Sequence, residues 1–204
     1  MHYLFFDLET SGLITKRGGK WFQLKYMPRI VSVCWTLTDE NNEVIDHSYY
    51  IIKPIGFEIP QESINVHGIT REIAMKNGIL FNRMILKLKR LISKYNKNNL
   101  TLVAHNMDFD FNVLKSELLR IQYQTFIKKI DEFKRICTKE DTIEYCKCEP
   151  FKWGKWKWPR LEELHQKCFN KPVENAHCAE DDVNALRACF FHLKDANDFQ
   201  HNWM

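Results

Sequence analysis

The stretch HYLFFDLET, residues 2–10, decides the fold expected for this chain. Successive side chains of a β-strand point to opposite faces, so Leu4, Phe6 and Leu8 share one face and Asp7 and Glu9 share the other. Both faces are otherwise apolar, which is typical of a central strand covered on both sides. Burying unpaired charge costs free energy, so the two acids must be compensated by something that the fold brings to them.

The segments around this strand predict an α/β domain. Residues 30–38 and 44–52 are β-rich runs on either side of the turn 39–42, which predicts a hairpin. Residues 15–25 are basic and contain glycine, which indicates a loop. Pro60 could open a short helix, and Thr70 could cap the next helix, which Gly78 would end.

Helical spacing recurs in the second half of the chain. Residues 84–95 place Met84, Leu88, Leu91 and Tyr95 on one stripe. A short apolar strand, 100–104, is followed by Asn106 as a helix cap. That helix would bury Phe111, Leu114, Leu118 and Ile121, and a last helix, 180–194, would bury Val183, Leu186, Phe190 and Leu193. We therefore expect a central mixed β-sheet flanked by α-helices.

Size and composition limit the class of protein. A length of 204 residues predicts one domain, 1–204, and 45% hydrophobic residues are enough to form a core. No apolar run reaches the roughly 20 residues that span a bilayer, and the N-terminus lacks the features of a signal peptide. Seven cysteines without a regular framework favour reduced thiols and an intracellular location. The net charge of +4 is compatible with nucleic acid but does not establish it.

Two further acidic boxes accompany the first strand: AHNMDFD at 104–110 and HCAEDD at 177–182. Helix positions five apart lie about 140° from each other, so His177 must precede the last helix if Asp182 lies in its first turn. Asp108 competes with Asp110, and Asp181 with Asp182, because acids favour helix N-termini in general. If the fold brings Asp7, Glu9, Asp110 and Asp182 together, they form a carboxylate cage for two hard divalent cations, the usual device for cutting phosphodiesters.

The three boxes, in this order and spacing, resemble the DEDDh subgroup of the DnaQ-like 3′–5′ exonucleases, and the resemblance runs from about Tyr3 to about Leu193. It implies a ribonuclease-H-like fold and two Mg²⁺ (or Mn²⁺) ions held by Asp7, Glu9, Asp110 and Asp182. The family spacing selects Asp110 over Asp108 and Asp182 over Asp181. His177 would be the general base, and the substrate a nucleic acid with a free 3′ end, more often a single strand.

The resemblance also implies contacts to the terminal nucleotide. Residues Thr10, Ser11, Gly12 and Leu13 would touch it, with Leu13 against its base and Gly12 allowing close backbone approach. His67, in the family's HGIT segment at 67–70, and Asn106 would lie near the same nucleotide. These six residues are the predicted substrate-binding set.

Several alternatives stay open. Residues 147–160 interleave lysines with Trp153, Trp156 and Trp158, which suits a single strand, although the tryptophans could equally pack a loop onto the core. Cys137, Cys146, Cys148, His165 and Cys168 suggest zinc, but their spacing is irregular. Besides an exonuclease, the chain could be a proofreading or interaction subunit docked on a polymerase, or a weakly catalytic single-strand binder. The sequence does not distinguish DNA from RNA.

Overall fold

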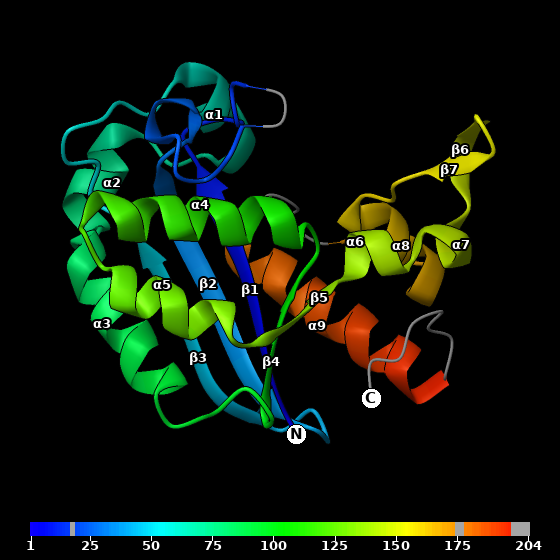
Figure 1. The fold of residues 1–204 in the computed structure, drawn as a ribbon. Helices are drawn as coiled ribbons and strands as arrows, with labels where there is room; N and C mark the ends of the chain where they lie inside the picture. The colour runs from blue at the N-terminus through cyan, green and yellow to red at the C-terminus, as the bar shows by residue number, and fades with distance from the viewer. Residues whose placement is uncertain (17–18, 174–177, 197–204) are drawn as a thin grey trace.

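A mixed five-stranded sheet forms the centre of the computed structural model, which describes residues 1–204 except 17–18, 174–177 and 197–204 (Figure 1). The strand order is β3-β2-β1-β4-β5. The strands are β1 (His2–Thr10), β2 (Ile30–Asp39), β3 (Val44–Ile51), β4 (Leu100–Ala104) and β5 (Lys134–Cys137). β1 pairs antiparallel with β2 and parallel with β4, so it is the middle strand of the sheet, as predicted.

Helices cover both faces of the sheet. One face lies under α3 (Phe81–Ile92), α4 (Met107–Arg120) and α5 (Gln124–Asp131), and the other lies against α9 (Ala179–Ala196) (Figure 1). Leu4, Phe6 and Leu8 pack under the three helices. Tyr3 and Phe5 pack against α9, with ring centroids 4.8 and 5.2 Å from that of Phe190. The alternation in β1 is therefore confirmed.

Shorter elements surround this core. The 3₁₀ turn η1 (Leu24–Tyr26) follows β1, and α1 (Gln61–His67) and α2 (Arg71–Asn77) follow β3. After β5 come α6 (Thr138–Asp141), α7 (Ile143–Cys146), the two-stranded hairpin β6 (Cys148–Lys152) and β7 (Lys155–Lys157), and α8 (Leu161–Phe169). In Figure 1 this hairpin extends away from the sheet, where we had expected a loop.

The predicted helix signals were right in part. Thr70 caps α2, because its hydroxyl accepts a hydrogen bond from the Ile73 amide at 3.2 Å, and Gly78 follows the last helical residue. The helix predicted at 84–95 is shifted, since α3 runs from Phe81 to Ile92 after an N-cap residue, Leu80, that cannot cap with its side chain. Asn106 precedes α4 but makes no capping bond; its side-chain carbonyl accepts from Lys139 Nζ at 3.2 Å instead.

None of the described helices is both long and apolar enough to cross a lipid bilayer.

Candidate active site

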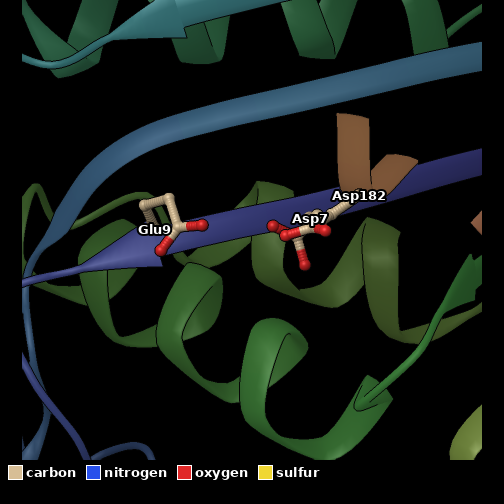
Figure 2. Close-up of side chains that lie close together, drawn as sticks. All are labelled: Asp7, Glu9 and Asp182. Atoms are coloured by element: carbon tan, nitrogen blue, oxygen red, sulfur yellow. The ribbon is translucent and has the colours of Figure 1, made fainter. Parts of the chain in front are cut away.

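Three carboxylates from distant parts of the chain meet at the end of β1. Asp7 and Glu9 lie two residues apart on β1, and Asp182 lies in the first turn of α9. One oxygen from each of the three can be chosen so that all lie within 4.8 Å of one another, and Figure 2 shows Asp182 reaching toward Asp7 from its helix. Within the described part of the chain this is the one group of metal-ligating side chains so arranged. An all-oxygen donor set fits Mg²⁺ or Mn²⁺.

Asp110 lies beside this group but is not a member of it. It is 4% exposed, in the first turn of α4, and its charge is the largest Coulombic influence on Asp7. β4 runs parallel to β1, with Val103 opposite Phe5, so the chain leaves β4 and enters α4 close to Asp7. Asp108 is exposed, and Asp181 is outside the group of three. The geometry thus agrees with the choice of Asp110 and Asp182 over their neighbours.

Packing these acids together disfavours their ionised forms. Burial, followed by repulsion from Asp110, Asp182 and Glu9, raises the pKa of Asp7 well above its usual range. Burial and the charge of Asp182 raise the pKa of Glu9 to about 7. Burial raises the pKa of Asp110 to about 8, although the backbone amides of Leu8 and of Asp110 itself oppose the shift. A site that disfavours its own negative charge is one that divalent cations would stabilise.

The predicted general base, His177, lies outside the described residues. α9 begins at Ala179, one residue before the predicted start, and the Asp182 amide donates to the Cys178 carbonyl at 2.9 Å. The helix therefore starts after His177 in the chain, while Asp182 is held in its first turn.

A cavity of about 550 Å³ adjoins the acidic group on the side of Glu9. Five of the six predicted substrate-binding residues line it, namely Thr10, Ser11, Gly12, Leu13 and His67. Leu13 is 79% exposed, so most of its apolar side chain is open to the cavity and to solvent. Gly12 has φ +144°, a conformation that side chains rarely adopt, so glycine is required there by the backbone as well as by any close approach of a ligand. Asn106 lines a different cavity, with Asp7 and Asp182.

His67 presents a defined tautomer to the first cavity. The Ile69 amide donates to His67 Nδ1 at 3.0 Å, so in the neutral ring the proton is on Nε2. Burial lowers the pKa of His67, although the Thr10 backbone carbonyl opposes this, and the neutral form prevails at neutral pH. Nε2 is buried and meets no acceptor with good geometry among the described residues. The Thr10 carbonyl is the acceptor on that side of the ring.

A buried ion-pair network anchors the turn after β1. Glu117 is 3% exposed and binds the Arg29 guanidinium through both carboxylate oxygens, while Arg120 lies 3.3 Å away. The Arg29 amide donates to the Ser11 hydroxyl at 2.9 Å, and the Ser11 amide donates back to the Arg29 carbonyl. The position of the cavity wall therefore depends on a glutamate more than a hundred residues away.

The zinc interpretation has no support among the described residues. The seven cysteines are free thiols, and none belongs to a metal-ligating group. The packing interpretation of the tryptophans is wrong for two of them, since Trp153 is 97% exposed and Trp158 is 57% exposed. Trp156 is half-buried, with its ring centroid 4.5 Å from that of Phe151.

Lys139 is the residue near the acids that the sequence did not suggest. It lines the cavity of about 500 Å³ that includes Asp7 and Asp182, and its charge lowers the pKa of Asp110. No motif marks it, because it lies one residue into α6 and far in sequence from every acidic box. Only the parallel pairing of β5 with β4 brings it to this edge.

The chain belongs to the RNase_T exonuclease family, because the model of that family, described as Exonuclease, matches residues 4–190. This agrees with the family resemblance carried by the three acidic boxes. The comparison with curated proteins gave no match.

Solved structures of exonuclease I share the fold. E. coli exonuclease I in complex with a 5cy-dT13 oligonucleotide has a TM-score of 0.74 and 20% identity, covering 97% of this chain and 41% of that one. The complex with a dA16 oligonucleotide has a TM-score of 0.69 and 19% identity, covering 95% and 41%. A moderately thermophilic exonuclease I from Methylocaldum szegediense has a TM-score of 0.71 and 19% identity, covering 97% and 41%. The ribonuclease-H-like fold is thereby confirmed, and this chain spans about two fifths of the length of those proteins.

Proposed function

We propose that this protein is a metal-dependent 3′–5′ exonuclease that hydrolyses nucleic acid from its 3′ end to nucleoside 5′-monophosphates. The observation that carries the proposal is the meeting of Asp7, Glu9 and Asp182, with Asp110 behind them, in a chain of an exonuclease family. Carboxylates from β1, α4 and α9 that raise one another's pKa serve no stability purpose, since unpaired buried charge destabilises a fold. A cation site explains why they are there.

In this proposal, Asp7, Glu9 and Asp182 would hold a divalent cation, and Asp110 would help to hold a second. When bound, such a pair activates a water molecule and stabilises negative charge on the departing 3′ oxygen. His177 takes the proton of the attacking water. The bond between phosphorus and the 3′ oxygen of the preceding nucleotide breaks, and the terminal nucleotide leaves with its 5′ phosphate.

The cavity of about 550 Å³ beside Glu9 is the proposed pocket for the terminal nucleoside. Leu13 and Phe109 line it as apolar surfaces for a base, and the neutral ring of His67 forms part of the same wall. Because the pocket adjoins the acids, the 5′ phosphate of a nucleotide bound there would lie at the carboxylates. Among the solved relatives, E. coli exonuclease I is in complex with a dA16 or a 5cy-dT13 oligonucleotide, and another structure is an ExoI/SSB-Ct complex. We carry over to this chain only the single strand as the substrate class.

The test uses purified protein, Mg²⁺ or Mn²⁺, and matched DNA and RNA oligonucleotides labelled at the 5′ end. A descending ladder of products that lose one nucleotide at a time is expected. A discrete internal product would indicate an endonuclease, and binding without cutting would favour the weakly catalytic single-strand binder. Asp7→Asn is the control, because it removes the carboxylate at the centre of the acidic group; undiminished hydrolysis by that variant would refute the proposed centre.

A further inference from the structure

A second cavity, of about 500 Å³, meets the acidic group from the side of Asp7 and Asp182. Glu9 lines the first cavity and is not part of the second, so the acids lie between the two. The remaining walls of the second cavity come from the end of β4, from α6 and from the segment that joins β7 to α8. They include three cations and an aromatic ring: Lys139, Lys157, Arg160 and Trp158.

Lys139 is held in place at this cavity. Its Nζ donates to the Asn106 side-chain carbonyl at 3.2 Å and lies 4.7 Å from the centre of the Trp158 ring. Its backbone amide donates to the His105 carbonyl at 3.1 Å. Among the described residues, Lys139 has no carboxylate at ion-pairing distance, whereas Lys157 in the same wall is bonded to Glu163. A half-buried ammonium without an acidic partner is suited to an anion that is not part of the protein.

The backbone next to Trp158 is fixed by a hydrogen bond from His105. The next residue, Pro159, is buried, and its carbonyl accepts a hydrogen bond from His105 Nε2 at 3.1 Å. Nδ1 of the same ring accepts from the Thr138 hydroxyl at 3.0 Å. Burial lowers the pKa of His105 to about 4, so the ring is neutral and this pair of bonds persists at neutral pH. The indole is 57% exposed above a fixed backbone, and an exposed aromatic side chain held in this way is characteristic of a binding surface.

We propose that the second cavity binds the nucleotides immediately upstream of the phosphodiester that is cut, with Trp158 stacking on a base and Lys139 and Arg160 contacting phosphates. The inference rests on the proposed exonuclease function and adds a second subsite to it. A ring for bases combined with cations for the backbone is the chemistry that binds single strands. A base in a duplex offers no free face to the ring, so the substrate class is single-stranded nucleic acid. One carboxylate, that of Glu162, also lines the cavity.

Two substrates separate this subsite from the catalytic centre. The first is a single-stranded oligonucleotide labelled at its 5′ end. The second is the p-nitrophenyl ester of thymidine 5′-monophosphate, which has a nucleotide and a scissile bond but nothing upstream. We expect Trp158→Ala and Lys139→Ala each to lower kcat/KM for the oligonucleotide by roughly tenfold more than for the ester, which corresponds to losing one stacked base or one phosphate contact. Trp158→Phe should recover most of the loss.

Matched controls come from the same chain. Trp153→Ala removes a more exposed tryptophan from the turn of the neighbouring hairpin, and Lys97→Ala removes a lysine just before β4, at the end of that strand away from the acids. Both should retain wild-type kcat/KM on the oligonucleotide. Fluorescence anisotropy of the labelled oligonucleotide in Ca²⁺ measures binding without turnover. There, Lys139→Ala should reduce the slope of log affinity against log salt by about 0.7, as expected for one phosphate contact.

The outcomes are distinct. Wild-type protein that hydrolyses neither substrate refutes the proposed function; loss of oligonucleotide binding in Trp158→Ala but not in Trp153→Ala would still support the subsite. Equal losses on the oligonucleotide and the ester would overturn the inference, because they would show that Trp158 and Lys139 act on the catalytic centre itself. Wild-type binding and turnover in both variants would also overturn it.

Discussion

The effect of the acidic group on the free energy of unfolding can be measured through Glu9, whose pKa is raised in the folded protein. Its carboxyl has an ordinary pKa of 4.5, which burial and Asp182 raise to about 7. Well below pH 4.5 the carboxyl is protonated in both the folded and the unfolded protein, so it contributes no difference. As the pH rises, the unfolded chain ionises first, and stability is lost until the folded carboxyl also ionises near pH 7. The shift amounts to about 3 kcal/mol at most, and to about 1–2 kcal/mol after solvent screening of this half-buried group.

Glu9→Gln removes that charge while keeping the shape of the side chain. In EDTA at about pH 8 the variant should therefore be more stable than wild type by about 1–2 kcal/mol. The gain should shrink toward zero at about pH 5. Urea unfolding at both pH values measures it directly. With saturating Mg²⁺ the order should reverse, because wild type gains about 2.7 kcal/mol at a hundred times its Kd and the variant gains less.

Glu62→Gln is the matched control, since Glu62 is an exposed acid in the wall of the same cavity. It should change stability by less than about 0.5 kcal/mol at either pH. Our reasoning would be refuted if Glu9→Gln were less stable than wild type in EDTA at about pH 8, or if its effect were the same at both pH values.

Three further predictions concern the same site. His177→Ala should lower kcat by roughly 10²–10⁴, the usual contribution of a general base, and wild-type turnover would exclude that role. Ca²⁺ in place of Mg²⁺ should bind but support little cutting, because it prefers more ligands and a looser geometry; a ladder at the full Mg²⁺ rate would contradict this. Glu117→Ala leaves Arg29 and Arg120 without their buried partner and should cost about 3–5 kcal/mol in urea unfolding, so a loss below 1 kcal/mol would show that the network does not anchor the turn.

The main elements of the fold were predictable because they depend on local periodicity. Alternation in residues 2–9 identified the central strand and its two faces, and helical spacing identified α9 and its buried side chains. The start of α3 was missed because Leu80 gives no capping signal. The β6-β7 hairpin was missed because its residues alternate no apolar side chains against a core, and most of its surface is exposed.

The residues of the candidate site that lie in a family motif were predictable, and the others were not. The family spacing selected Asp110 and Asp182 over Asp108 and Asp181, and the structure brings the selected pair to Asp7. Five residues predicted to contact the terminal nucleotide line one cavity. Asn106 occupies the N-cap position of α4 as predicted, but its side chain makes no capping bond and instead accepts from Lys139, 33 residues further along the chain.

By itself, then, the order of residues along the chain determined the strand that carries Asp7 and Glu9, the helix that carries Asp182 and the family to which the protein belongs. Only the tertiary structure decided that a lysine from α6 and a tryptophan from beyond the hairpin lie beside those acids. The physical reason is that periodicity and spacing report on interactions between near neighbours in sequence. A cavity is made by packing segments whose separation in sequence bears no relation to their distance in space.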